Sequence, residues 1–183
     1  MSVVYEGKSI KGRSILIRYP QKEDLNSMWR YINKLSKERT FIRLQGEEIS
    51  LKEESEYLDS LLHAVAQKKG ISLLLFFEKE LIGLAGLKMG EKTERHRGTF
   101  HLSVDRNYRG EGIGTLLMSF TIEEAIRYIP DLEIVCLSLF ARNFAALHIY
   151  KKYGFIEIGR LPRGIKLGEQ YDDQIIMYKQ LRV

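Results

Sequence analysis

The stretch Arg109-Gly110-Glu111-Gly112-Ile113-Gly114-Thr115 decides the fold that we expect for this chain. An apolar run, Thr99 to Val104, precedes it, and a helical pattern, Leu116 to Ile129, follows it. A strand that ends at a glycine-rich turn and continues as a helix leaves the first amides of the helix without partners inside it. The helix dipole adds partial positive charge at the same end. The sequence therefore predicts an anion site, most naturally for a phosphate or pyrophosphate.

The spacing of the glycines excludes two common phosphate-binding loops. A P-loop requires a lysine after its last glycine, but Thr115 follows Gly114. A dinucleotide-binding turn requires a glycine where Thr115 stands. The pattern that fits is Arg-x-x-Gly-x-Gly at positions 109, 112 and 114. It resembles the acyl-CoA loop of the GCN5-related N-acetyltransferase (GNAT) family.

A second stretch strengthens this resemblance. Residues 141–155 read Ala-Arg-Asn-Phe-Ala-Ala-Leu-His-Ile-Tyr-Lys-Lys-Tyr-Gly-Phe. They are similar to the family's second signature, in which an Asn opens a helix, a Tyr follows seven residues later, and Gly-Phe comes next. The two signatures stand in the family's order and at about its spacing. The resemblance covers nearly the whole chain and is sharp from about residue 99 to 155.

The composition is that of an ordinary globular protein. The chain has 183 residues, 44% hydrophobic and 29% charged, and we expect one domain over residues 1–183. The N-terminus lacks the apolar segment of a signal peptide, and no apolar run approaches a membrane span. The single Cys136 suits a reducing compartment, so we expect a cytoplasmic protein without membrane partners. The net charge of +5 is spread along the chain, which favours an anionic ligand such as CoA over nucleic acid.

The residue patterns predict an α+β fold with a mixed sheet. The resemblance implies the three-layer GNAT arrangement, in which helices flank a central sheet that is splayed at the acyl-CoA site. A long basic connection with Arg160, Arg163 and Lys166 is expected between the last two strands. The expected strands are 14–18, 71–77, 81–89, 99–104, 132–140, 156–158 and 171–178, and the expected helices start near residues 25, 51, 113 and 143.

The second expected helix is acidic at its start. Ser50 and Glu53 have the spacing of a capping box. Residues 47–59 carry six acidic residues and one Lys. We expect a solvated helix face, with acids placed near the helix start by the dipole. The alternative is an acidic rim that attracts a cationic amine. The apolar residues expected to share the buried face are Leu51, Leu58, Leu61, Leu62 and Val65.

The resemblance implies acetyl-CoA as co-substrate and a set of residues that bind it. Arg109 would contact its pyrophosphate or fix the loop. Val104 ends the strand, and its amide would face the thioester carbonyl, where one preorganised donor is typically worth ~3 kcal/mol. Asn143 would hydrogen-bond the pantetheine arm, or cap its helix as Asn commonly does. The amides expected to hold the pyrophosphate run from Gly110 to Thr115 and include those of Gly112, Ile113 and Gly114.

The resemblance also implies direct acetyl transfer to an amine, with Tyr150 protonating the departing thiolate. A thiol pKa near 8.5 and a phenol pKa near 10 allow such a transfer. Many members of the family carry a Glu as base at the position of Thr99, so the base stays unassigned. His101 lies two residues along the same strand face and titrates near neutrality. A water chain, or an amine already partly neutral, would remove the need for a dedicated base.

The acceptor and the assembly are less determined. The resemblance covers enzymes that act on small amines, amino acids or protein N-termini. A catalytically inactive CoA-binding sensor on the same fold is the alternative, because Thr99 replaces the usual Glu. The four histidines and Cys136 show no metal-ligand spacing, so no metal is expected. Many members of the family are dimers, and a homodimer is therefore an expectation of the resemblance.

Overall fold

The computed structural model describes residues 3–181. These residues form two compact units. The first runs to Lys88 and includes His101–Pro130, and the second consists of Met89–Phe100 and the residues from Asp131 onward. Strand β5 (Arg97–Val104) contributes to both.

The first unit contains an antiparallel sheet in the order β1-β2-β3-β4. Its strands are β1 (Val3–Lys8), β2 (Ser14–Arg18), β3 (Gly70–Phe77) and β4 (Glu80–Met89). Strand β3 is buried along almost its whole length. This explains why its sequence is a continuous apolar run rather than an alternating one, since both of its faces are covered.

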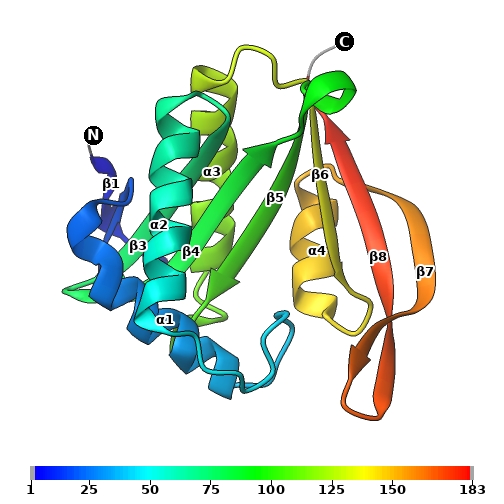
Figure 1. The fold of residues 1–183 in the computed structure, drawn as a ribbon, viewed down its shortest axis with the longest axis horizontal. Helices are drawn as coiled ribbons and strands as arrows, with labels where there is room; N and C mark the ends of the chain where they lie inside the picture. The colour runs from blue at the N-terminus through cyan, green and yellow to red at the C-terminus, as the bar shows by residue number, and fades with distance from the viewer. Residues whose placement is uncertain (1–2, 182–183) are drawn as a thin grey trace. The chain divides into compact units, whose positions relative to one another are not determined.

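Helices cover both faces of this sheet. Figure 1 shows α1 (Leu25–Lys37) and α2 (Leu51–Ala66) on one face and α3 (Ile113–Tyr128) on the other. The core under α1 and α2 gathers residues from both helices and from β3 and β4. Short 3₁₀ turns at Lys22–Asp24 and Arg106–Tyr108 precede α1 and the glycine-rich loop. The members of this core are Met28, Tyr31, Leu35, Leu58, Leu61, Leu74, Phe76, Leu81 and Leu84.

The second unit carries a mixed sheet. The start of β5 pairs in parallel with β6 (Ile134–Phe140), from Arg97 opposite Ile134 to Thr99 opposite Cys136. On its other side β6 pairs antiparallel with β8 (Gln170–Gln180) along its full length. Strand β8 also pairs with β7 (Ile156–Leu167). Helix α4 (Phe144–Lys152) and the 3₁₀ turn Lys92–Glu94 complete this unit.

The structure confirms the α+β class and the mixed sheet, and it corrects three details. Strand β1 was not expected from the sequence. The basic connection that holds Arg160, Arg163 and Lys166 is not a loop, because β7 and β8 form one long hairpin through it. Leu51 is exposed, and the buried stripe of α2 begins with Glu54 instead.

Candidate active site

The glycine-rich loop enters α3 through two left-handed residues. Gly110 has φ +74° and Gly112, the N-cap of α3, has φ +72°. A side chain at either position would be strained, which is the physical reason for glycine there. Among residues 3–181, no hydrogen bond is recorded from the amides of residues 110–115 to another protein group. These donors lie at the positive end of the α3 dipole, which is an arrangement that favours an anion.

Arg109 is held at the base of this loop. Its Nε donates to the carbonyl oxygen of Val104 at 2.8 Å, and its Nη2 donates to the Glu38 carboxylate at 2.7 Å. Glu38 also accepts from the backbone amide of Arg106 at 3.3 Å. Of the two roles that the sequence left open for Arg109, this arrangement favours fixing the loop. The end of β5 is therefore tied to the last turn of α1.

Glu111 fixes the loop from its other side. Its carboxylate is almost fully buried and lies 3.0 Å from Arg13 Nε and 3.7 Å from Lys11 Nζ. The Arg13 guanidinium, and next the Lys11 charge, lower the pKa of Glu111. The one acidic side chain of the loop is thus neutralised by cations from the β1–β2 hairpin, so it does not oppose an anion at the amides.

A cavity of about 340 Å³ opens between α1, α2 and strands β4 and β5 in the first unit. Its walls are mainly apolar, and its polar groups come from α1, α2 and β5. No Lys or Arg is among the described residues that line it. The cavity volume falls at the lower end of the range for small-molecule pockets. The lining residues are Met28, Tyr31, Ile32, Leu44, Ile49, Glu53, Glu54, Tyr57, Leu84, His101 and Ser103.

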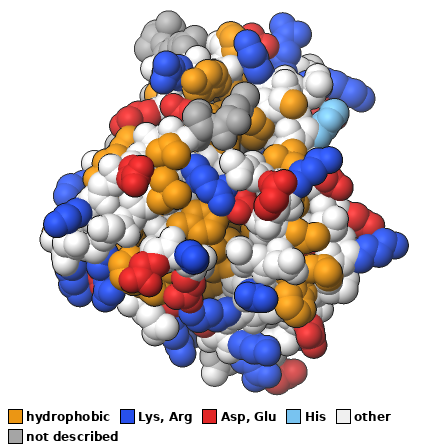
Figure 2. Space-filling model, turned by 90° about the vertical axis from the view of Figure 1, so that its left-hand side faces the viewer, with side chains coloured by type: hydrophobic (Ala, Val, Ile, Leu, Met, Phe, Trp, Pro, Cys, Tyr) orange, Lys and Arg blue, Asp and Glu red, His pale blue; other side chains and the backbone are white. Residues whose placement is uncertain are grey.

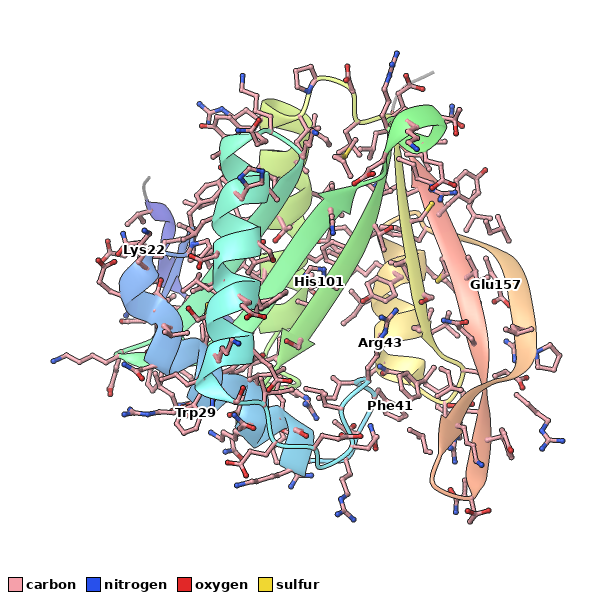
Figure 3. The ribbon with its side chains drawn as sticks, viewed as in Figure 1. Lys22, Trp29, Phe41, Arg43, His101 and Glu157 are labelled. Atoms are coloured by element: carbon pink, nitrogen blue, oxygen red, sulfur yellow. The ribbon has the colours of Figure 1, made fainter. Side chains whose placement is uncertain are left out.

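Helix α1 holds the segment that forms one wall of this cavity. Asn33 donates from Nδ2 to the carbonyl of Ile49 at 3.0 Å and accepts from the Ile49 amide at 2.9 Å. Trp29 Nε1 donates to the same carbonyl at 2.7 Å. Trp29, labelled in Figure 3, thus holds the cavity wall by a hydrogen bond as well as by packing. Its indole and the Asn33 amide fix Ile49 against the cavity.

His101, labelled in Figure 3, lies on β5 and lines the same cavity. Its ring occupies the space above Gly86, where an added Cβ would lie 2.6 Å from His101 Cε1. Although the residue keeps surface toward the cavity, dense surrounding protein atoms lower the pKa of His101 to about 4. The imidazole is then neutral at pH 7 and is a weak base.

In the second unit, the residues of the second signature lie on α4. Asn143 is the N-cap, and its Oδ1 accepts from the amide of Ala146 at 3.2 Å. Tyr150 is buried, and its ring packs edge-on against Phe100, with 6.3 Å between centroids, and at a tilt against Phe155, with 5.7 Å between centroids. Burial raises the pKa of Tyr150 to about 12. Its hydroxyl therefore keeps its proton at every physiological pH.

Comparison with known proteins shows which family has these features. The model of the acetyltransferase (GNAT) family matches residues 29–155. The chain belongs to the GNAT family. It is thus an acyl-CoA-dependent N-acetyltransferase, and acetyl-CoA is its co-substrate.

Individual relatives agree with this membership. The chain is 25% identical over 166 residues to a spermidine N(1)-acetyltransferase of Escherichia coli, covering 90% of this chain and 84% of the relative. A crystal structure of a GNAT acetyltransferase from Streptococcus pneumoniae matches with TM-score 0.84 and 27% identity, covering 91% of this chain and 99% of that one. The structure of yncA from Salmonella typhimurium with its cofactor acetyl-CoA matches with TM-score 0.80 and 18% identity, covering 92% and 95%.

The GNAT loop and helix could be found from the sequence, but several residues around them could not. Glu38, which holds Arg109, belongs to no sequence motif, and neither does Tyr31, whose hydroxyl lies 2.9 Å from Ser103 Oγ. Glu54 belongs to an acidic run that resembled a solvated face. The sequence feature that could have indicated burial of Glu54 is its spacing to Leu58 and Leu61, which places all three residues on one face of the helix.

Three further features bear on partners. Within the described range, no helix is both long and apolar enough to cross a bilayer, and no three His, Cys, Asp or Glu residues come together as metal ligands would. On the face drawn in Figure 2, lysines and arginines are scattered among acidic and apolar side chains and form no continuous basic patch.

Proposed function

We propose that this enzyme transfers the acetyl group of acetyl-CoA to a primary amino group of a small cationic amine. The single observation that carries the proposal is the cavity in the first unit, with apolar walls, a buried carboxylate and no Lys or Arg among its described lining residues. Such a site suits an aliphatic chain that carries positive charge. The E. coli relative is named for spermidine, which is a molecule of this kind.

The co-substrate supplies an acetyl group activated as a thioester, and this chain's residues supply binding and proton handling. We assign the diphosphate to the amides of Gly110 to Thr115, among them Gly112, Ile113 and Gly114. We assign the loop-fixing role to Arg109, a contact with the pantetheine arm to Asn143, and the backbone donor toward the thioester carbonyl to Val104. The loop fits this task because its amides have no hydrogen-bond partner among residues 3–181 and its acid is neutralised by cations.

Tyr150 is proposed as the group that stabilises the departing thiolate. With a pKa of about 12, its phenol is a weaker acid than a thiol of ordinary pKa near 8.5. Complete proton transfer to the thiolate is therefore uphill, and a hydrogen bond from the phenol is the larger contribution. The residue that takes the proton from the amine remains a choice between His101, with its low pKa, and water.

Residues 1–183 are proposed to act as one catalytic domain. The family model starts in the first unit, at residue 29, and ends in the second, at residue 155. Neither unit alone contains the whole match, which is the support for treating the chain as a single domain.

Release of free CoA from acetyl-CoA, with mass spectrometry of the product, tests the proposed function. The acceptors are spermidine, 1,4-diaminobutane, butylamine, free amino acids and a peptide with an N-terminal alanine. We expect equimolar CoA and mono-N-acetylated amine, with the cationic aliphatic amines as the best acceptors. Turnover restricted to the peptide would overturn the small-amine assignment, and CoA binding without turnover on any acceptor would overturn the enzymatic one.

A further inference from the structure

Two neighbouring acids line the cavity, and their carboxylates differ in their bonding. The Glu53 carboxylate takes part in the capping box of α2, because its Oε2 accepts from the amide of Ser50 at 2.8 Å and from Ser50 Oγ at 2.6 Å. Glu54 is 4% exposed, and neither a hydrogen bond nor an ion pair is recorded for its carboxylate within residues 3–181. A buried carboxylate without a protein partner is unfavourable, and a positively charged ligand group in the adjoining cavity would compensate it.

The surroundings of Glu54 give its carboxylate no compensating charge. Burial alone raises the pKa of Glu54 to about 7. The titratable groups that face it across the cavity are Tyr57, Tyr31, Glu53 and His101. None of these is cationic at pH 7, since the two phenols and the imidazole are neutral and Glu53 is anionic. A cation entering from solvent is the group that this site lacks.

The shape of the cavity restricts what carries that cation. Met28, Ile32, Leu44, Ile49 and Leu84 line its body with methylene and methyl groups. A volume of about 340 Å³ accommodates a short aliphatic chain with room for a few waters. An extended alkyl chain therefore has apolar contacts along its length and one carboxylate at which a charged end can lie.

We propose that Glu54 is the counter-ion for a second cationic group of the acceptor, so that the enzyme selects diamines and polyamines over monoamines of the same length. This inference rests on the proposed function. The nitrogen that attacks the thioester must be neutral, so an ion pair between Glu54 and that nitrogen would have to break before reaction. A second ammonium group stays charged throughout. Its ion pair with Glu54 holds the acceptor in place from binding to product.

The test compares two acceptors of equal length in wild-type enzyme and in Glu54→Gln. The acceptors are 1,4-diaminobutane and butylamine, which differ in the second amino group. We expect Glu54→Gln to raise KM for the diamine roughly ten- to a hundredfold, as for the loss of a charged hydrogen bond. Its KM for butylamine should change less than about threefold, and kcat for both amines should be retained, so the preference for the diamine disappears.

A matched control uses another acid of the same helix. Glu56 points to solvent, with 69% of its side chain exposed. Glu56→Gln should leave both KM values unchanged. An equal loss of kcat with both amines in Glu54→Gln would show a role in proton removal and would overturn the proposal, as would an unchanged diamine preference.

A measurement on the unmodified enzyme guards against a misfolded variant. At pH 7.5 and equal concentration, 1,4-diaminobutane should raise the Tm of the wild-type protein more than butylamine does. Equal shifts would contradict the proposal. If the wild-type enzyme acetylates no amine at all, the proposed function fails, whereas turnover with no effect of Glu54→Gln on the diamine overturns this inference alone.

Discussion

Arg109 and Glu38 form an ion pair at 2.7 Å that ties the glycine-rich loop to the end of α1. The same guanidinium reaches the Val104 carbonyl at 2.8 Å, so one side chain links the end of β5, the loop and a helix. The Glu38 side chain is only 4% exposed, whereas that of Arg109 is 41% exposed. Glu38 is thus the buried partner of this ion pair. Because its carboxylate holds Arg109, we expect removal of the Glu38 charge to disturb the glycine-rich loop.

Glu38→Gln should destabilise the protein and weaken acetyl-CoA binding. The amide keeps the shape of the side chain but loses a charge-assisted hydrogen bond worth about 1.5–3 kcal/mol. For a chain of this length we expect Tm to fall by several degrees, with a higher Kd for acetyl-CoA by calorimetry. Glu56→Gln, which removes an exposed partner of Lys52 at 3.9 Å, is the control and should change neither quantity. A Glu38→Gln protein that matches wild type in both would show that this ion pair does not hold the loop.

Gly110→Ala should reduce acetyl-CoA affinity beyond its effect on stability. Gly110 has φ +74°, and Gly168, in the β7–β8 turn of the second unit, has φ +59°. An added Cβ meets no other group within 4 Å at either position, so both alanine variants carry mainly the backbone cost of about 1–2 kcal/mol. We expect similar losses of Tm but a roughly tenfold weaker Kd for Gly110→Ala alone. Equal Kd values for the two variants would argue against diphosphate binding at this loop.

Tyr150→Phe should separate turnover from binding. The ring contacts with Phe100 and Phe155 remain, so the fold should be kept. Loss of the hydroxyl should lower kcat by about a hundredfold, with little change in the Kd of acetyl-CoA. Because burial raises the pKa of Tyr150 to about 12, wild-type kcat should show no fall from phenol ionisation below pH 10. A variant with wild-type kcat would exclude the hydroxyl from the chemistry.

The stability of the ligand-free protein should depend on pH through Glu54. Its folded pKa of about 7 lies above the ordinary value of 4.5, so its contribution to stability is complete below 4.5 and is lost as pH rises to about 7. His101 acts oppositely, because its folded pKa of about 4 lies below 6.5 and stability is lost as pH falls. The difference in Tm between Glu54→Gln and wild type isolates Glu54. Between pH 5 and pH 8, the Tm of Glu54→Gln should rise relative to the Tm of the wild-type protein. A Tm difference that does not change with pH would show that Glu54 is well solvated.

The parts of this fold that follow from local rules could be predicted from the sequence. Gly110 and Gly112 have positive φ because the chain turns there, and Ser50 caps α2 through Glu53 as its spacing indicates. The helix that begins after Asn143 ends before Gly154, which has φ +81°. In each case the required backbone geometry restricts the residue type, so the residue type reveals the geometry.

The parts that depend on tertiary context could not be predicted. Hydrophobicity places Leu51 on the buried face of α2, but that position is 46% exposed and Glu54 is buried instead. No local rule gives a carboxylate a buried position. The sequence predicts only residues 156–158 of β7, because Pro162 and the irregular pairing between Leu161 and Ile165 interrupt the alternation that marks a strand.

The most direct test of this account compares the affinities of acetyl-CoA and S-acetyl-pantetheine for the wild-type protein by isothermal titration calorimetry. The two ligands share the thioester and the pantetheine arm, and S-acetyl-pantetheine lacks the nucleotide and its diphosphate. If the amides of the loop before α3 bind the diphosphate, acetyl-CoA should bind at least about tenfold more tightly, and the excess should largely vanish in Gly110→Ala. Equal affinities for the two ligands, or an excess that Gly110→Ala leaves intact, would contradict the assignment of the loop.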